Sequence, residues 1–494
     1  MNELLRKIDF GNEAGDDLSP EEILNFFVEQ KPFIEYLNSK NKILLATAKK
    51  GVGKSALIRW IEAKVSEIDK RNPLVIRVTG SDLVRSCFKL TNTLRLPNDY
   101  IRDWMIRICA IINRRIGAQL SIALTDDQIA MVESAELDGF KNRNILSALT
   151  ERLTKLLPSI QKIKEQIPNE IEILKRFSNK TVWFLVDDLD ATYQRTEQEN
   201  LELSTFFSAC RYLSMRTNGI IFRATMRTDV WTMIRRYDES LDKFEQYVSD
   251  ISWSQADFRT LLFKRIEYQM NQLGLQATTP PQHVTKTEVE EHMIDKVFEK
   301  RMLWGSTEKR TYKVIYTLSY HRPRWAIQLC KLTQKEAIEK EANLIAKSHI
   351  DTVWGEYGTK RIADLIAEHK HQCSNIEELL VGFRGAKRRM DRPTLLKWIS
   401  NHITNHMSPI IEGREEKNPL DIAHFLYRLG FIVARVDDKE NNEYEHYYFS
   451  DMPDFLSTRT NDDFGSVWEI HPCYREALDI KKMNKYQKNR RLAR

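Results

Sequence analysis

The sequence ILLATAKKGVGKSALI, residues 43–58, decides the fold that we expect for this chain. Five residues that suit a buried strand lead into a glycine-rich loop, and apolar residues then return at the spacing of a helix. A strand, a loop of the form GxxxxGK(S/T) and a helix together are the context of a phosphate-binding P-loop. Ala48 stands where this form has its first glycine, which makes the loop entry less able to adopt a positive φ. We treat this as a minor departure and predict a Walker A loop.

The residues of this loop suit the binding of ATP with Mg²⁺. Backbone N–H groups that converge on the phosphates, and the positive end of the helix dipole, favour a bound polyphosphate. We expect Lys54 to reach the β- and γ-phosphates and the Ser55 hydroxyl to be a ligand of Mg²⁺. The predicted nucleotide-binding residues are Lys50, Gly51, Val52, Gly53, Lys54, Ser55 and Ala56.

A second apolar strand, residues 182–186, ends in acidic residues. Asp187 and Asp188 follow it directly, and the carboxyl ends of parallel strands form the edge where ligands bind. We expect Asp187 to hold Mg²⁺ together with Ser55, and Asp188 to orient the attacking water. For Asp190 two roles stay open, a residue that orients this site and a helix N-cap.

Two arginines are candidates for sensing the γ-phosphate. Arg227, with Thr228 as the alternative, follows the strand at residues 219–225, whose end faces the same edge. Arg324 follows Pro323 at the start of an amphipathic helix in a predicted lid. For both arginines, a role as an ordinary surface residue is an equally good interpretation.

The rest of the chain divides into segments with different apolar spacing. Within residues 97–178 apolar residues recur at helical spacing, which predicts helices. Nearer the C-terminus, a predicted helix ends at Gly430 and is followed by stretches that suit strands. We therefore predict an α/β fold: a parallel-sheet P-loop NTPase core with a helical insertion and a helical lid, followed by a C-terminal winged-helix-like module. The expected segments are a helical preamble (1–40), the core (41–253) with its insertion (97–178), the lid (254–345), a helical linker (346–415), the winged-helix-like domain (416–478) and a basic tail (479–494).

Composition and charge narrow the class of protein. The 494 residues carry a formal net charge of only +6, and no apolar run approaches the about 20 residues that a membrane span needs. The start, MNELLRKIDFGNEAGDD, has no apolar stretch typical of a signal peptide. Six dispersed cysteines, none at CxxC spacing, indicate reduced thiols. We expect a cytoplasmic protein without a membrane segment.

A possible zinc site is the weakest of the signals. His369, His371 and Cys373, with His402 and His406, lie in a polar region without the fixed spacing of ligand pairs. We therefore interpret these residues as solvated surface.

Four stretches resemble a family of bacterial P-loop ATPases near the AAA+, STAND and KAP classes, which occurs in prophages and anti-phage defence islands. The stretches are residues 10–14, 26–28, 50–57 and 467–472. This resemblance implies that Asp187 and Asp188 form the Walker B motif, that Arg227 is a STAND-type arginine sensor, and that Arg324 is the lid arginine of AAA+ proteins. Asp188 departs from the glutamate common in AAA+ enzymes, which implies slow turnover.

Two functions remain. The first is an ATP-dependent switch that controls assembly or a protein partner, plausible in anti-phage defence; the second is a DNA-binding initiator or loader of the AAA+ type. Residues 437–463 contain nine acidic residues against two basic ones, a charge that DNA would repel, so we favour the switch with a protein partner or a homo-oligomer. The basic cluster 387–392 and the basic tail keep nucleic acid open as a partner. A scaffold with an inactive nucleotide site is disfavoured because Lys54, Ser55 and Asp187 are intact.

Overall fold

The computed structural model describes residues 3–69, 73–85, 96–119, 181–216, 219–237, 239–275, 285–305, 307–438, 443–457 and 466–480. Internal contacts divide the chain into two compact units. The N-terminal unit is Asn12–Asp257, and the C-terminal unit combines Met1–Gly11 with Phe258–Arg494. Most of the predicted insertion, the basic tail and part of the acidic stretch 437–463 lie outside the described residues.

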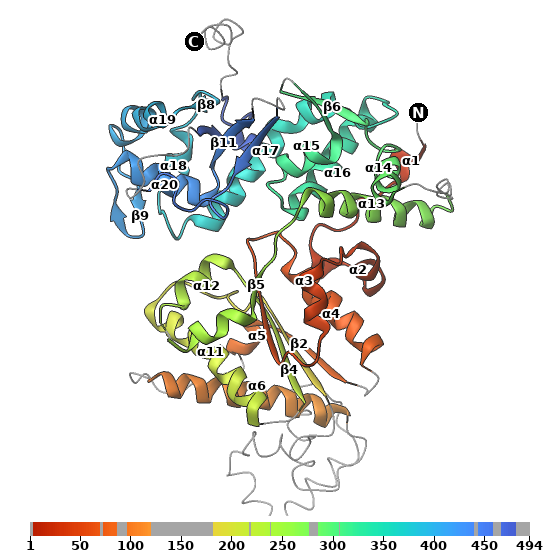
Figure 1. Ribbon diagram of the computed structural model, residues 1–494, viewed down its shortest axis with the longest axis vertical. Coiled ribbons are helices and arrows are strands. Elements are labelled where there is room, and N and C mark those ends of the chain that lie inside the picture. Colours follow the sequence, from red (N-terminus) through yellow and green to blue (C-terminus); the bar gives the residue numbers. More distant parts are fainter. Residues whose placement is uncertain are drawn as a thin grey trace, which may run out of the picture. The chain divides into compact units, whose positions relative to one another are not determined.

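A five-stranded parallel sheet forms the centre of the N-terminal unit, as Figure 1 shows. Its order is β2-β3-β4-β1-β5, so β4 separates the P-loop strand β1 from the acidic strand β3. This is the sheet of a P-loop NTPase core, and the predicted α/β fold class is confirmed. The strands are β1 (Ile43–Thr47), β2 (Leu74–Thr79), β3 (Val182–Asp187), β4 (Ile220–Met226) and β5 (Val248–Asp250).

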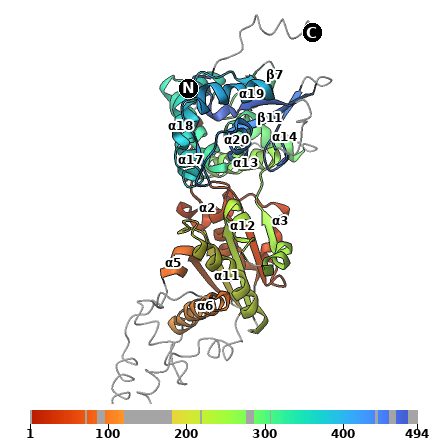
Figure 2. The ribbon, with the colours of Figure 1, turned by 90° about the vertical axis from the view of Figure 1, so that its left-hand side faces the viewer.

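Helices cover both faces of this sheet, which is why β3 and β4 are buried along their whole length. Figure 1 shows α11 and α4 on opposite sides of the strands, and the turned view of Figure 2 brings α11 and α6 forward. Trp104 of α6 packs edge-on against Phe206 of α11, with ring centroids 5.3 Å apart. The helices are α4 (Lys54–Ile68), α5 (Gly80–Arg85), α6 (Pro97–Gln119), α11 (Glu197–Arg216) and α12 (Thr228–Ile234), with the 3-10 segment η3 (Glu239–Tyr247) before β5.

Short helices precede β1: η1 (Gly15–Asp17), α2 (Pro20–Phe26), α3 (Lys31–Ile34) and η2 (Glu35–Leu37). Ser19 caps α2 through a capping box with Glu22. Arg223 of β4 is fully buried and donates hydrogen bonds to the carbonyl oxygens of Tyr36, Asn38, Asn41 and Phe222. Burial lowers the pKa of Arg223 to about 9. This arginine therefore ties the segment before β1 to the sheet through main-chain oxygens rather than through a carboxylate.

The C-terminal unit is mainly helical, with α1 (Glu3–Lys7) packed on α16. The side-chain amide of Gln334 in α16 donates to the carbonyl oxygens of Leu5 and Ile8. The longer elements are α13 (Gln255–Gln272), α14 (Lys286–Ile294), α15 (Thr311–Leu318), α16 (Pro323–Glu339), α17 (Lys347–His369), α18 (Ile376–Val381), α19 (Arg392–Ile399), η4 (Ser400–Thr404) and α20 (Pro419–Leu429).

Short strands interrupt the two segments expected to be helical. β6 (Arg301–Trp304) and β7 (Thr307–Arg310) form an antiparallel hairpin, and β9 (Ile410–Ile411) pairs with β10 (Arg414–Glu415). In β6 buried residues alternate with exposed ones, and this period of two was too short a signal to separate from its helical surroundings.

The C-terminal unit also contains a four-stranded antiparallel sheet of order β12-β11-β13-β8. Its strands are β8 (Arg389–Met390), β11 (Ile432–Asp438), β12 (Glu443–Tyr447) and β13 (Val467–Ile470), followed by η5 (Pro472–Tyr474). Gly430, with a φ of 78°, ends α20 as predicted and leads into β11. Helices followed by a small antiparallel sheet are the arrangement expected for this module.

Candidate nucleotide-binding site

The loop between β1 and α4 has the backbone that its glycines predict. Gly51 and Gly53 have φ values of 79° and 116°, a region that residues with a Cβ rarely adopt. Gly53 is the N-cap of α4, and Lys54 begins the helix. Ala48 does not need a positive φ: its N–H donates to the carbonyl oxygen of Met226 at 3.1 Å, which extends the pairing of β1 with β4. The missing first glycine is therefore accommodated without strain.

Trp253, just after β5, supports this loop from the side. Its indole N–H donates to the carbonyl oxygen of Val52 at 2.7 Å. A Cβ added at Gly53 would lie 4.0 Å from the same ring. No local pattern in the sequence singled out Trp253, because its partner in the loop lies about 200 positions earlier in the chain.

Asp187 lies at the end of β3, where only 4% of its surface is exposed. The Thr225 hydroxyl donates to its Oδ1 at 2.7 Å, and the side chain of Ser55 is near enough to lower the pKa of this carboxyl group. Burial, and then the neighbouring charge of Asp188, raises the pKa of Asp187. A buried carboxylate whose charge is disfavoured in this way, next to a P-loop serine, suits a divalent cation.

Asp188 occupies a turn with a φ of 43°. Its N–H lies 3.0 Å from both Asp187 Oδ1 and Thr225 Oγ1, and its half-exposed carboxylate lies 3.5 Å from Lys54 Nζ. Gly80 at the start of α5 packs against this turn, since a Cβ there would come within 2.5 Å of the carbonyl oxygen of Asp188. The structure thus brings Lys54, Ser55, Asp187 and Asp188 together at the carboxyl edge of the sheet.

Asp190 pairs with Arg227 across this edge. The buried Asp190 carboxylate accepts hydrogen bonds from the backbone N–H and the guanidinium Nε of Arg227. α11 begins only at Glu197, so the interpretation of Asp190 as a helix N-cap was wrong. The pair fixes the orientation of the arginine that was predicted to sense the γ-phosphate.

Asp250 at the end of β5 is a further carboxylate at this edge. Its Oδ1 accepts hydrogen bonds from the hydroxyls of Thr47, at 3.0 Å, and Thr228, at 2.9 Å. It therefore links the ends of β1, β5 and the turn after β4. No local pattern marked it, because its partners are about 20 and about 200 positions away.

Arg324 lies in the first turn of α16, in the C-terminal unit, and is partly exposed. The neighbouring Arg322 is buried and forms an ion pair with Glu368 at 2.8 Å. The contact of Arg324 with a nucleotide stays a prediction.

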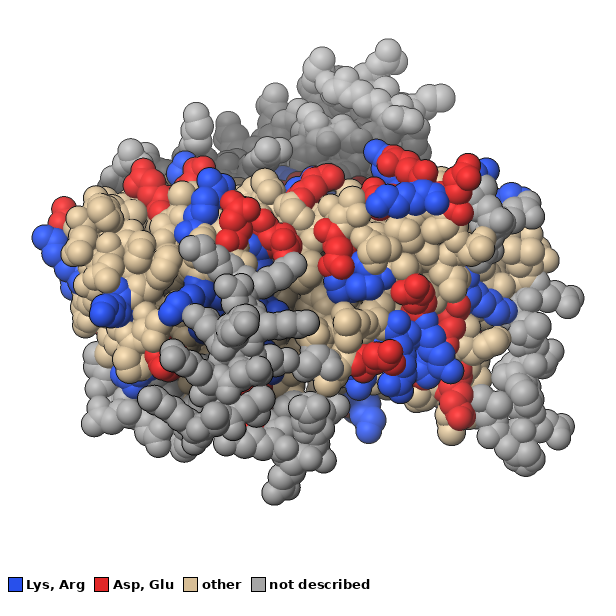
Figure 3. Space-filling model, turned by 90° about the horizontal axis from the view of Figure 1, so that it is seen from above, with Lys and Arg blue, Asp and Glu red and all other residues tan. Residues whose placement is uncertain are grey.

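Other signals in the sequence have plain structural settings. Within the described residues no group of three or more His, Cys, Asp and Glu could hold a metal ion, and the five described cysteines are buried and form no disulfide. None of the described helices is long and apolar enough to cross a membrane. Figure 3 shows Lys and Arg interspersed with Asp and Glu on the face in view, rather than a field of one sign.

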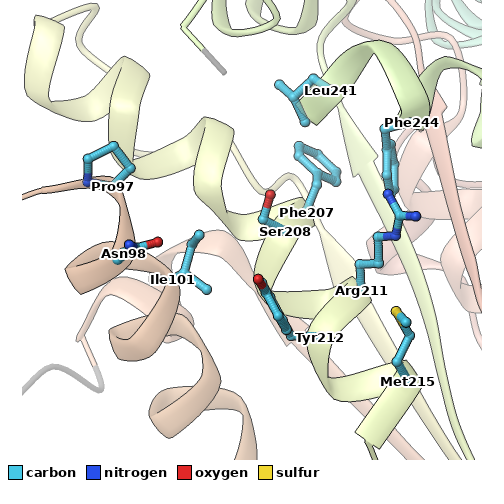
Figure 4. Close-up of a pocket in the computed structure, with 10 residues that line it drawn as sticks. All are labelled: Pro97, Asn98, Ile101, Phe207, Ser208, Arg211, Tyr212, Met215, Leu241 and Phe244. Carbon is cyan, nitrogen blue, oxygen red and sulfur yellow. The ribbon is translucent and has the colours of Figure 1, made fainter. Parts of the chain in front are cut away.

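A separate groove of about 470 Å³ lies between α6, α11 and η3 (Figure 4). It contains none of the P-loop or acidic residues, so it is not part of the candidate site. Its lining is Pro97, Asn98, Ile101, Phe207, Ser208, Arg211, Tyr212, Met215, Leu241 and Phe244.

Comparison with known proteins gives one family match and several loose structural ones. Residues 256–366 match the model of the FunZ-associated C-terminal helical domain, and no curated protein matches the chain. The ORC2 protein of Aeropyrum pernix in ADPNP–ADP complexes is similar at a TM-score of 0.41 and 13% identity, over 94% of this chain and 93% of that one.

Two further solved structures are similar at 11% identity and a TM-score of 0.30. They are Cdc6p from Pyrobaculum aerophilum, over 95% of both chains, and the RuvB Holliday junction branch migration motor of Thermotoga maritima, over 74% of this chain and 80% of that one. At such TM-scores the backbones agree only loosely, so none of these proteins' functions follows for this chain.

Proposed function

We propose that this chain binds MgATP, hydrolyses it slowly, and uses the nucleotide to switch its own assembly or its hold on a protein partner. The observation that carries the proposal is the meeting of four groups at one sheet edge. Ser55 lies near the buried Asp187 carboxyl group and lowers its pKa, and Lys54 Nζ lies 3.5 Å from Asp188 Oδ1. These groups suit Mg²⁺ and a polyphosphate better than any other ligand.

In this proposal each group has one task. Lys54 and the loop N–H groups bind the phosphates, while Ser55 and Asp187 hold Mg²⁺. Bound Mg²⁺ neutralises the phosphate charge that develops during hydrolysis. Asp188 orients the water, and Arg227, held by Asp190, contacts the γ-phosphate. Slow turnover follows from Asp188, because its side chain is one methylene shorter than glutamate and its carboxylate is already paired with Lys54.

The switch rests on the two predicted arginine sensors. Arg227 follows β4 and Arg324 begins α16, and we expect each of these separate elements to respond to the γ-phosphate. A ligand shifts such an equilibrium only by its differential affinity for the two states. The resemblance to ATPases of defence islands makes anti-phage defence the biological context that we propose, in the cytoplasm.

A DNA-acting loader is the second candidate. The basic cluster 387–392 favours it, whereas the nine acidic residues of the stretch 437–463 favour a protein partner or a second copy of this chain. Binding of duplex DNA therefore separates the two candidates.

The nucleotide is tested first. Calorimetric titration of MgATP into the full chain should show binding that Lys54→Ala weakens roughly 10- to 100-fold, because a charge-assisted phosphate contact is lost. Lys49→Ala, two positions before the first loop glycine, removes the same charge and serves as the control. Equal affinity in a folded Lys54→Ala variant would reject the P-loop assignment.

Assembly is tested second. Sizing the chain with a non-hydrolysable ATP analogue should reveal a change in mass that Arg324→Ala abolishes while ATP stays bound. Tight, salt-sensitive binding of duplex DNA without any nucleotide-dependent change in size would replace the switch with the loader.

A further inference from the structure

One face of the C-terminal sheet carries a buried charge network. Glu469 of β13, only 1% exposed, is its centre. Arg389 of β8 donates to this carboxylate at 2.5 Å and Arg475 at 2.6 Å, while Arg435 of β11 is 3.4 Å away. His446 of β12 lies 3.1 Å from the same carboxylate. Residues from the other three strands and from the segment after η5 therefore converge on one acid of β13.

Arginines outnumber carboxylates in this network. Arg388 adds a fourth guanidinium, whereas the only other acid that contacts the four arginines in the described residues is the half-exposed Asp437, 2.5 Å from Arg435. Burial lowers the pKa of His446, so the imidazole is neutral and does not change the count at pH 7. Four positive charges thus face two negative ones, and burying an excess of charge is costly.

Two of the donors in this network lack a partner. Arg388 Nε and Arg475 Nη1 are buried N–H groups without a hydrogen-bond acceptor among the described residues, and Arg475 is only 5% exposed. Burial, and then the positive charge of Arg475, lowers the pKa of Arg388 to about 10. The charges of Arg388 and Arg475 therefore repel each other, while Glu469, which is hydrogen-bonded to Arg475, attracts both. A buried unsatisfied donor of this kind indicates a water or an ion that completes it.

We propose that Arg388 and Arg475 bind a phosphoryl end group. Guanidinium groups present paired N–H donors that match phosphate oxygens, and a phosphoryl dianion would balance the excess of two positive charges. An internal phosphodiester of a nucleic acid carries only one negative charge. To reach this mostly buried cluster it would also have to bring the nucleotides on both of its sides with it. The ligand is thus a free phosphate or the terminal phosphate of an oligonucleotide. This site is independent of the proposed P-loop chemistry.

Inorganic phosphate is the first probe. It is titrated calorimetrically into the full chain, both the parent and Lys54→Ala, so that binding at the P-loop is separated from binding here. Phosphate should still bind the Lys54→Ala chain, and adding Arg388→Gln should weaken this binding roughly 10- to 100-fold. Lys387→Gln, which removes the same charge from the exposed neighbouring residue, should leave it unchanged.

Thermal unfolding gives a second readout that a structural arginine would not produce. Without phosphate, Arg388→Gln should unfold at the parent's temperature or higher, because the change removes a guanidinium charge that burial and Arg475 disfavour, and Arg388 forms no ion pair with the described residues. With phosphate, the parent and Lys387→Gln should gain stability, while Arg388→Gln should not. Three results would each overturn the proposal. They are a lack of saturable phosphate binding by the parent, equal binding by Arg388→Gln, and a lower unfolding temperature of ligand-free Arg388→Gln than of the parent.

The source of the phosphoryl group is separated by oligonucleotides. Competition by a 5′-phosphorylated single strand, but not by the same strand with a 5′-hydroxyl, supports a nucleic-acid end as the ligand. Competition by neither strand, with phosphate still bound, supports the free ion. Equal competition by both strands, lost in Arg388→Gln, means that internal phosphates bind, which overturns the end-group proposal.

Discussion

Two charged regions of the molecule carry an excess of opposite sign. The acidic edge of the parallel sheet, around Asp187, has more carboxylates than cations, whereas the charged face of the antiparallel sheet, around Glu469, has more arginines than carboxylates. At the first there are three acids and two cations: Lys54 lies 3.5 Å from the half-exposed Asp188, Arg227 pairs with the buried Asp190, and Asp187 is also buried. Burial and Asp188 raise the pKa of Asp187. At the second, burial alone would raise the pKa of Glu469, but Arg475 and the His446 hydrogen bond lower it well below its usual value.

This difference says which kind of ligand each place suits. A carboxylate whose charge is disfavoured gains most from a bound cation, whereas guanidinium groups in excess over carboxylates gain most from a bound anion. The direction of the pKa shift of the central carboxylate therefore distinguishes a candidate Mg²⁺ site from a candidate phosphate site in the same chain. Three substitutions at these centres test that interpretation.

The largest effect is expected at Asp188. If Asp188 orients the attacking water, Asp188→Asn should bind MgATP normally but hydrolyse it roughly 10²- to 10⁴-fold more slowly. Phosphate release under saturating ATP measures this, and calorimetry of ATP binding is the control for an intact site. If Asp188→Asn hydrolyses ATP at the parent's rate, a different group at this edge orients the attacking water.

A smaller but still severe effect is expected at Glu469. Glu469→Gln leaves three arginines around a neutral amide, which should lower the free energy of unfolding by about 3–5 kcal/mol. Denaturant unfolding at pH 7 measures the loss, and Asp437→Asn, on the half-exposed partner of Arg435, should cost much less. Similar losses for both variants would mean that the buried carboxylate is not the centre of the network.

The pH dependence of the same carboxylate has a definite sign. Because the folded-state pKa of Glu469 is lowered, its contribution is present above the ordinary carboxyl pKa and is lost as pH falls below it. The stability difference between the parent and Glu469→Gln should therefore shrink on acidification. A difference that grows at low pH would contradict the direction of the shift.

The sequence predicted the acidic edge far better than the charged face, and the reason is the distance between partners. The Walker A loop is one continuous stretch, and the acid pair follows its own strand, so local spacing was enough for both. Asp250 and Trp253 were not predicted, because their partners near the loop lie about 200 positions away in the sequence. Arg389 and Glu469 are 80 positions apart, and in the sequence Arg389 was only one member of a basic cluster.

The basic cluster also shows what charge counting cannot resolve. Arg388 and Arg389 are adjacent in sequence and identical in type, yet Arg389 is paired with Glu469 whereas Arg388 has a buried Nε without an acceptor in the described residues. The strand register decides this: Arg389 lies opposite Glu469 in the pairing of β8 with β13. Only the fold could separate the structural arginine from the one that we assign to a ligand.

The smallest effect is expected at Asp187, and its sign is the opposite of that at Glu469. Because the folded-state pKa of Asp187 is raised, the ionised carboxylate destabilises the fold at neutral pH, increasingly so as pH rises through that pKa. Asp187→Asn should therefore unfold at a slightly higher denaturant concentration than the parent when Mg²⁺ and nucleotide are absent. Its amide oxygen can still accept the hydrogen bond that Thr225 donates.

In the presence of Mg²⁺ and ATP the order should reverse, because the variant loses a ligand of the metal and the parent gains stability from binding. The parent and the variant are compared in chelator and in saturating MgATP. A variant that is less stable than the parent in chelator would mean that Asp187 stabilises the fold, and the contrast with Glu469 would then be lost.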